Sequence, residues 1–331
     1  METTFIDILI PTYNREKFIL KNLNLLTTSI KENNLQNEVG IIISDNCSKD
    51  ETRTSVENFI ETNRGFKISY FLQEKNKGAT HNIIFLVGKS VAPYFMILGD
   101  DDYLNSNYLK TVIEILKNDK SVKCILNACN KIDVNGKLIK KNNDINNEVY
   151  TEGFQNVYSN IHRMNILSGI VIKNENMYQL LLEKKVKNEY PHIFMACYSC
   201  LFGKTFYVSD FPRLITADNI QYWKYDSLGF LNDIYENFKL LPITNLERFI
   251  LEKEIYKRQK WRILYKKKYA FKKFWYVFTL SFSKNTSTIG RFLHPLIILK
   301  IRSEIISNKT SQKFKNYIGK YKLYLEKIMK Y

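Results

Sequence analysis

The chain has 331 residues, which is long enough for one large α/β domain with an appendage and for a sizeable core. Hydrophobic residues make up 45% of it, with 22 Tyr and 21 Phe, and this composition excludes an intrinsically disordered chain. The net charge of +17 belongs to residues 251–331, which hold 21 Lys and Arg against 4 Asp and Glu, whereas residues 1–250 hold 29 of each. Because the larger part is neutral, we expect no nucleic-acid partner.

Short apolar runs alternate with segments of helical periodicity through the first 120 residues. The apolar runs predict buried strands at 5–10, 39–44, 67–73 and 94–98. The periodic segments predict helices at 16–30, 50–63, 80–88 and 107–118. Such alternation predicts an α/β fold, with a Rossmann-like, mainly parallel sheet flanked by helices and a ligand crevice at the carboxyl ends of the strands.

The second part of the chain is less regular. Residues 122–134 predict one or two strands, and the stretch Asp133-Val-Asn-Gly136 is typical of a hairpin turn. From residue 251 onward the pattern is helical, basic and aromatic. Its longest apolar stretches fall short of the ~20 residues that span a bilayer.

Five scattered cysteines, an odd number, indicate free thiols. No signal-peptide pattern opens the chain, since Glu2 and Asp7 flank the first apolar run, so we expect a cytoplasmic protein. The pair Cys197 and Cys200 could suggest zinc or redox chemistry. We interpret the two instead as buried helix residues, because free Cys commonly acts as a small core hydrophobe.

Three polar clusters follow directly on predicted strands, at 11–15, 45–48 and 99–102. In the predicted sheet all three lie on the same rim. Asp100, Asp101 and Asp102 repel one another, and a divalent cation would neutralise them. Carboxylates and substrate phosphates together hold Mg²⁺ or Mn²⁺, so a divalent metal cofactor is predicted; the alternative is a solvated acidic turn.

These residues resemble the inverting glycosyltransferases of family 2, which have the GT-A fold, over residues 5–200. Pro11-Thr-Tyr-Asn-Arg15 is similar to the stretch after the family's first strand. Asp45-Asn-Cys-Ser-Lys-Asp50 is similar to the end of its second strand. Asn76-Lys-Gly78 with Asn82 resembles its Asn-x-Gly stretch, and Gly99-Asp-Asp-Asp-Tyr-Leu resembles its Asp-x-Asp metal motif.

The resemblance implies a site for the nucleotide of a nucleotide-sugar. Its residues would be Pro11, Thr12, Tyr13, Asn14, Arg15, Asp45, Asn76, Gly78, Asn82, Asp100 and Asp101. Aligning on Leu98 and Leu104 puts Gly99 where the family has its first Asp and favours Asp101 as the metal ligand. The frame Asp100-x-Asp102 favours Asp102 instead, so all three carboxylates stay metal candidates.

An inverting transfer needs a general base for the acceptor hydroxyl. In the family this base lies at the start of a helix, and here Pro191 is typical of a first-turn residue. His192 and Glu189 are the candidates, and each also has a structural alternative, a core histidine and a solvated acid respectively. Ser168 and Gly169 resemble the acceptor region, and Trp223 is a candidate stacking platform for an acceptor sugar.

We therefore expect a GT-A catalytic domain over residues 1–240, with a nucleotide-binding half at 1–120 and an acceptor half at 121–240. A basic helical C-terminal appendage follows at 241–331. The expected reaction transfers a sugar from a nucleotide-diphosphate donor, with UDP favoured, to a glycan or lipid-linked glycan in bacterial surface polysaccharide synthesis. The alternatives are a non-catalytic protein that binds a nucleotide-sugar or a carbohydrate, and a nucleotidyltransferase, although residues 11–17 lack the glycines of a triphosphate loop.

The basic aromatic C-terminal region suits an anionic membrane surface, where aromatic rings lie at the interface and Lys and Arg add attraction. We therefore predict a cytoplasmic protein that associates peripherally with the inner face of the membrane. The structural alternative is a helical appendage whose aromatic side chains pack internally and whose lysines are solvated.

Overall fold

The computed structural model describes residues 3–216, 229–258 and 270–300 of the chain. The chain divides into two compact units. The first unit comprises Met1–Asp226 and Glu236–Pro242, and the second comprises Ser227–Tyr235 and Ile243–Tyr331. Each unit is described by itself below.

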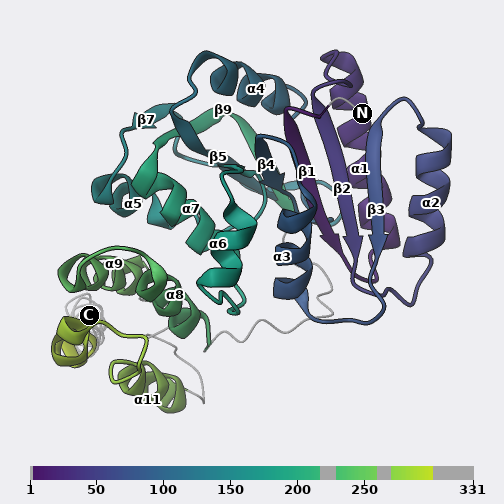
Figure 1. Cartoon of the computed structure of the whole chain (residues 1–331). Helices are drawn as coiled ribbons and strands as arrows, with labels where there is room; N and C mark the ends of the chain where they lie inside the picture. The colour runs from purple at the N-terminus through teal and green to yellow at the C-terminus, as the bar shows by residue number, and fades with distance from the viewer. Residues whose placement is uncertain (1–2, 217–228, 259–269, 301–331) are drawn as a thin grey trace, which may run out of the picture. The chain divides into compact units, whose positions relative to one another are not determined.

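The N-terminal half of the first unit alternates strands with helices, as the sequence predicts (Figure 1). The strands are β1 (Ile6–Thr12), β2 (Val39–Asp45), β3 (Lys67–Leu72) and β4 (Tyr94–Ile97). The helices are α1 (Glu16–Glu32), α2 (Thr52–Thr62), α3 (Ala79–Lys89) and α4 (Tyr108–Asn118). The eight elements predicted here are confirmed to within two residues at each end.

The following segment adds five strands and four short helical elements. The strands are β5 (Val122–Ile132), β6 (Leu138–Lys140), β7 (Glu148–Tyr150), β8 (Ile170–Lys173) and β9 (Lys204–Thr216). The helical elements are α5 (Phe154–Asn160), η1 (Ile161–Arg163), α6 (Met177–Glu183) and α7 (Pro191–Phe202). The turn after β5 is confirmed, with Gly136 at φ 87° donating to the Asp133 carbonyl at 3.0 Å. Cys197 and Cys200 are buried free thiols within α7, also as predicted.

Within the described residues nine strands form one mixed sheet, whose main path is β3-β2-β1-β4-β8-β5-β9-β7, with β6 paired to β5. The predicted α/β class with flanking helices is confirmed, and β1 to β4 are parallel to one another. The expectation of a mainly parallel sheet needs refinement, because β8 is antiparallel to both of its neighbours, β4 and β5. Strand direction depends on the connections, and these cannot be derived from apolar runs alone.

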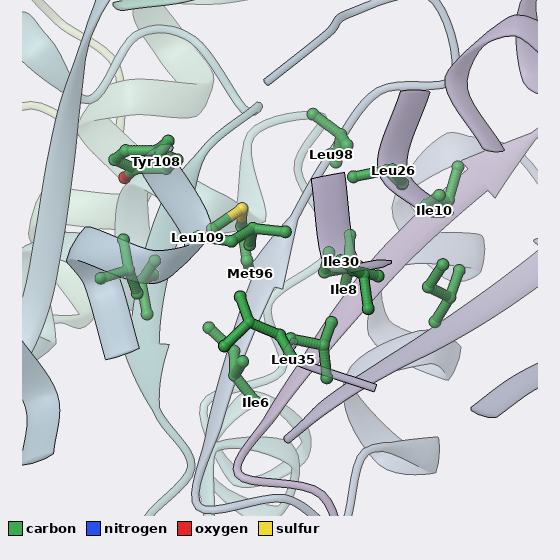
Figure 2. Close-up of a cluster of buried hydrophobic side chains, with 14 of the residues drawn as sticks. Ile6, Ile8, Ile10, Leu26, Ile30, Leu35, Met96, Leu98, Tyr108 and Leu109 are labelled. Atoms are coloured by element: carbon green, nitrogen blue, oxygen red, sulfur yellow. The ribbon is translucent and has the colours of Figure 1, made fainter. Parts of the chain in front are cut away.

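The core of the first unit lies between the sheet and the helices on one of its faces. Ile6, Ile8 and Ile10 alternate along β1 and therefore point to the same face. They cluster with Leu26 and Ile30 of α1, and each of these five side chains is at most 2% exposed (Figure 2). This packing holds the carboxyl ends of the strands in place for the polar segments that follow them.

The second unit is helical in its described part. It contains the start of α8 (Gly229–Leu240), α9 (Asn245–Arg258), α11 (Ala270–Leu280) and a helix at 288–300. Glu252 is fully buried and accepts hydrogen bonds from the Ser287 amide at 2.8 Å and hydroxyl at 2.7 Å, beside His294 at 3.4 Å. Burial raises the pKa of Glu252 to about 7 and lowers that of His294 to about 4.

Across the described ranges, no helix combines the length and apolar character that a membrane crossing requires.

A buried carboxylate in β1 determines which residue the neighbouring strand can carry. Asp7 accepts hydrogen bonds from the Thr4 hydroxyl at 2.6 Å and the Ser90 hydroxyl at 2.8 Å, and Gly40 of β2 lies opposite. A Cβ atom at Gly40 would lie 2.5 Å from Oδ1 of Asp7. We expect Gly40→Ala to lower the free energy of unfolding by about 1–3 kcal/mol in urea titrations, because the added methyl overpacks this site.

The matched control is Gly65→Ala, since a Cβ atom there would meet nothing within 4 Å. It should change the free energy of unfolding by less than about 0.5 kcal/mol. Equal destabilisation by the two substitutions would contradict the steric explanation.

Candidate active site

The polar segments predicted to share a rim do lie at the carboxyl ends of adjacent strands. Thr12 ends β1, Asp45 ends β2, and the two residues are register partners. Residues 99–102 follow β4, which pairs with β1 on its other side. The Thr12 hydroxyl connects two of these segments, because it donates a hydrogen bond to Oδ2 of Asp100 at 2.7 Å.

Asp45 organises the loops around the end of β2. It is fully buried, and its Oδ1 accepts from the Ser48 amide at 2.8 Å and from the Ser48 hydroxyl at 2.6 Å. Its Oδ2 accepts from the Tyr70 hydroxyl of β3 at 2.8 Å. The Ser48 hydroxyl in turn accepts from the amide of Asn14, which has φ 53°. Asp45 thus connects the segments after β1 and β2 to β3.

The Asn76 to Gly78 segment leads into α3, which begins at Ala79. Oδ1 of Asn76 accepts from the Gly78 amide and from the Asn46 side chain, both at 2.9 Å. Gly78 has φ 88°, a conformation that favours glycine. Asn82 is buried, and its amide group donates to the Ser44 carbonyl while its carbonyl accepts from the Ser44 hydroxyl. Asn82 therefore holds α3 against β2, and its assignment to nucleotide binding stays a prediction.

The three adjacent carboxylates differ sharply in their surroundings. Asp100 and Asp102 are 2% and 8% exposed, whereas the Asp101 side chain is 20% exposed. Asp102 accepts from the Ser168 hydroxyl and from the Thr216 amide at 3.1 Å. Asp101 is the one of the three that faces outward, so the geometry favours it for contact with a ligand.

Arg15 lies beside the Asp101 carboxylate. Its side chain is 1% exposed, and its Nη2 lies 3.6 Å from Oδ2 of Asp101. Its guanidinium also lies over the Phe18 ring, 5.1 Å from the centroid. Arg15 therefore places a buried positive charge beside the outward-facing carboxylate.

Burial controls the protonation of the other two carboxylates. Loss of solvation, and then the negative charge of Asp101, raises the pKa of Asp100 to about 8. The same two causes raise the pKa of Asp102 to about 7, although the Ser168 hydrogen bond opposes the rise. A divalent cation at this segment would favour the charged forms and would therefore compete with protons.

Ser168 and Gly169 lie directly beside the acidic segment. The Ser168 hydroxyl accepts from the Gly99 amide at 2.9 Å and donates to Asp102. Gly169 has φ 78°, and a Cβ atom there would lie 2.8 Å from Cδ of Arg213. The two residues therefore form part of the wall behind the carboxylates, and their assignment to the acceptor stays a prediction.

Three further residues of this site carried no signal in the sequence. Asn22 of α1 donates to the Gly99 carbonyl at 2.9 Å and to the Asp102 carbonyl at 2.8 Å. Thr216 ends β9 and donates to both Asp101 and Asp102. Arg213 is 1% exposed, and its positive charge partly offsets the rise in the pKa of Asp102. Each lies in an otherwise ordinary helix or strand, so only tertiary structure identifies it.

The turn that carries the base candidates is braced from two elements. The Asn188 carbonyl accepts from the Thr80 hydroxyl of α3 at 3.0 Å. The Asn188 side chain donates to Asn237 of α8 at 2.7 Å, and Asn237 donates to the Tyr190 carbonyl at 2.9 Å. Glu189, within this turn, is exposed.

His192 follows in the first turn of α7, which begins at Pro191 as predicted. Its side chain is buried, and this burial lowers its pKa to about 3, so the imidazole is neutral near pH 7. Trp223, the predicted stacking platform, lies outside the described residues. No group of three or more His, Cys, Asp or Glu side chains suited to holding a metal occurs in the described part of the chain.

Comparison with known families identifies the chain. Residues 7–197, more than half of the sequence, match the profile described as "Glycosyl transferase family 2". The chain belongs to this family. The match includes every predicted donor-site residue and both base candidates of this family 2 chain.

Two named glycosyltransferases are similar in sequence to this family 2 chain. Abequosyltransferase RfbV of Salmonella typhimurium strain LT2 is 25% identical over 207 residues, which cover 56% of this chain and 58% of RfbV. Poly(ribitol-phosphate) beta-N-acetylglucosaminyltransferase TarS of Staphylococcus aureus strain Mu50 is 32% identical over 104 residues, covering 31% of this chain and 17% of TarS. The matched regions thus span less than two thirds of the length of either relative.

Solved structures share the fold of this family 2 chain. The crystal structure of S. aureus TarS 1–349 in complex with UDP-GlcNAc has a TM-score of 0.65 at 17% identity, covering 92% of this chain and 88% of that one. The mannosyltransferase PcManGT of Pyrobaculum calidifontis, in complex with GDP-Man and Mn²⁺, has a TM-score of 0.51 at 13% identity, with 91% and 87% covered. At these identities the similarity establishes the fold.

The pKa values of Asp100 and Asp102 predict how stability depends on pH. Both pKa values lie above the ordinary value of 3.8. The contribution of these groups to the free energy of unfolding is therefore fully present below about pH 4 and is lost as the pH rises to about 8. In EDTA at pH 9 we therefore expect Asp100→Asn and Asp102→Asn to unfold at higher temperature than the wild type. The advantage should shrink as the pH falls toward 4.

Thermal unfolding across this pH range is the measurement. Glu114→Gln, which changes an exposed acid of α4, serves as the control and should show no such trend. An advantage of the two Asn variants that stays constant with pH would show that these carboxyls are not penalised by burial.

The brace on the 188–190 turn gives a second prediction. Asn237→Ala removes partners from Asn188 and Tyr190, which are both buried. The unfolding free energy should fall by about 1–3 kcal/mol, because buried polar groups lose their hydrogen bonds. Amide hydrogen exchange in the turn should accelerate.

Asn24→Ala provides the comparison, since it removes one exposed hydrogen bond within α1. It should leave both the unfolding free energy and the exchange in the 188–190 turn nearly unchanged. Unchanged exchange in the Asn237 variant would mean that the turn does not depend on this brace.

Proposed function

We propose that this chain transfers a sugar from a nucleotide-diphosphate donor, with UDP favoured, to an acceptor hydroxyl, with inversion at the anomeric carbon. The observation that carries the proposal is the position of Asp101. It is the outward-facing carboxylate of three at the end of β4, and it lies beside Arg15 and next to the paired ends of β1 and β2. Membership of glycosyl transferase family 2 supports the reaction class, and the named relatives are both glycosyltransferases.

In this proposal the base and ribose of the donor lie over the ends of β1 and β2. The segment 11–15 and Asp45 supply the floor, and Asn76 and Gly78 supply the side at the start of α3. Asp45 would accept from a nucleobase N–H, because each carboxylate oxygen can accept more than one hydrogen bond. The TarS structure with UDP-GlcNAc supports a nucleotide-sugar donor for this fold.

A divalent cation, Mn²⁺ or Mg²⁺, fits the acidic segment. Asp101 would be the direct ligand, with Asp100 and Asp102 behind it contributing negative charge. A cation held by one or two carboxylates completes its coordination with donor phosphates, so a cluster of three protein ligands is not required. When bound, it neutralises the diphosphate and so stabilises the leaving group.

Glu189 is favoured over His192 as the general base. A base becomes more positive by one charge when it takes the acceptor proton. For buried His192 this creates a charged imidazolium, which burial disfavours, as its lowered pKa shows. For exposed Glu189 the same step neutralises a carboxylate, which involves no such penalty. We therefore propose that His192 stays uncharged and positions the first turn of α7.

The acceptor would approach from the side of Ser168 and Gly169. We propose a glycan or a lipid-linked glycan as its chemical class, and hence a place in bacterial surface polysaccharide synthesis. The names of the two relatives, an abequosyltransferase and a poly(ribitol-phosphate) glucosaminyltransferase, support acceptors of this kind. The corresponding cellular location is the cytoplasm, where nucleotide-sugars are made.

The reaction class can be tested without knowing the acceptor, because such enzymes slowly hydrolyse their donors. Nucleotide release would be measured from UDP-, GDP-, CDP- and dTDP-sugars with Mn²⁺ or with EDTA. We expect release from one donor in Mn²⁺ only, and a loss of about 100-fold or more in Asp101→Ala. Asp210→Ala, which removes an exposed acid of β9, should keep full activity.

If no donor is cleaved and calorimetry detects no metal-dependent nucleotide binding, the transferase proposal fails. A non-catalytic carbohydrate-binding protein would then be the better interpretation. Metal-independent cleavage with an unchanged Asp101→Ala rate would instead refute the assigned metal ligand.

The choice of base can be tested once the donor is known. Glu189→Gln should lower kcat by about 100-fold or more, and it should abolish the acidic limb of the pH–rate profile, because this limb reports protonation of the base. His192→Gln should retain that limb even where kcat falls. If His192→Gln abolishes the acidic limb and Glu189→Gln retains it, His192 is the base.

A further inference from the structure

The helix at 288–300 in the second unit is apolar on two opposite faces. Its inner face carries His294 and Ile298, both fully buried. The His294 ring packs against the rings of Phe249, with centroids 5.5 Å apart, and Tyr256, at 4.8 Å. This inner face is sufficient to explain how the helix is held in its unit.

The outward face of the same helix is also apolar. Phe292 is 76% exposed and Leu296 is 62% exposed, and Leu293 and Leu299 are exposed as well. Spacings of three and four residues place 292, 296 and 299 on one stripe, with 293 at its margin. A helix that is hydrophobic all round is normally covered on every side, so this stripe indicates a binding surface.

The preceding helix repeats the pattern with aromatic residues. Trp275 and Phe278 of α11 stack with ring centroids 5.7 Å apart, and Phe278 meets Phe282 edge-on at 5.9 Å. Trp275 is 55% exposed and Phe282 is 59% exposed. We call Phe292, Leu293, Leu296 and Leu299 the apolar surface of the second unit; Trp275 and Phe282 are further exposed aromatic side chains of the same unit.

The charge around the apolar surface selects among possible partners. Residues 270–300 contain five Lys and Arg and no Asp or Glu. Arg291 and Lys300 are exposed on the helix that bears the leucines. A second copy of this chain would bring the same positive charge to the contact and would be repelled. An anionic lipid surface attracts basic residues and accommodates Trp, Phe and Leu at its interface.

We propose that the apolar surface of the second unit inserts into the interface of an anionic lipid bilayer. Phe292 and Leu296 enter the boundary between headgroups and acyl chains, and the flanking Arg291 and Lys300 contact the lipid phosphates. The helix lies along the membrane plane, as expected of a short helix with basic flanks. This binding uses residues of the second unit alone and does not require the proposed sugar transfer.

The test is sedimentation of the full chain with vesicles of phosphatidylcholine, with and without phosphatidylglycerol. We expect binding to the anionic vesicles only. Phe292→Ser combined with Leu296→Ser should lower the partition coefficient by about tenfold or more, because two large apolar groups no longer insert. This double variant keeps every positive charge. It therefore separates the insertion of apolar side chains from the electrostatic attraction of the basic C-terminal region.

Leu246→Ser is the matched control, since Leu246 is 57% exposed on α9 but lies outside the apolar surface. It should bind like the wild type, and circular dichroism should show all variants folded. The proposal is overturned if the wild type ignores anionic vesicles or if the double variant binds equally well. It is also overturned if light scattering shows a wild-type dimer that the double variant dissociates, because the occupant would then be a second copy.

Donor hydrolysis provides an independent readout on the same samples. The double variant should release nucleotide in solution at the wild-type rate. Loss of vesicle binding with retained hydrolysis would support the membrane surface. Failure of hydrolysis in the wild type would refute the proposed function and leave the vesicle result unaffected.

Discussion

Three consecutive carboxylates at the end of a buried strand are the constraint on which the first unit depends. Charges so close together and so poorly solvated are unfavourable unless neighbours supply hydrogen bonds or positive charge. Those neighbours come from β1, α1, the loop before β8 and the end of β9. The acidic segment thereby joins the two halves of the first unit, because Asp102 is hydrogen-bonded to Ser168 and Thr216, which lie 66 and 114 positions later in the chain.

The same arrangement separates the three carboxylates by role. Oδ2 of Asp100 and both carboxylate oxygens of Asp102 accept hydrogen bonds from the protein, and burial favours the protonated forms of the two residues. The Asp101 side chain is 20% exposed, and its Oδ2 lies 3.6 Å from Nη2 of Arg15. At the proposed metal site, an outward carboxylate backed by two buried ones would gain negative charge when a cation displaces protons. Such a site would offer few direct ligands, and phosphate oxygens of the donor would complete the coordination.

Local patterns were sufficient to predict the parallel half of the fold. Each strand and helix from β1 to α4 has its own periodicity, and the polar segments at 11–15, 45–48 and 99–102 follow strand ends as expected. The direction of β8 was not predictable in this way, because it depends on how the chain returns through α5 and η1. Asn22, Arg213 and Asn237 were missed for a related reason. Their partners lie far away in sequence, and an Asn or Arg within a regular element has no distinctive local signal.

The bracing of the 188–190 turn has a consequence for the order in which the protein assembles during synthesis. The strands that carry the proposed donor-side segments, β1 to β4, all lie before residue 102, so their pairing can form early on the ribosome. The turn with Glu189 needs Thr80, already in place, and Asn237, which emerges almost fifty residues later. A nascent chain can therefore pair β1 to β4 well before the 188–190 turn is braced. Premature termination between Asp102 and Asn237 would yield a chain that has the strands of the proposed donor side but lacks the brace on the turn that carries the proposed base.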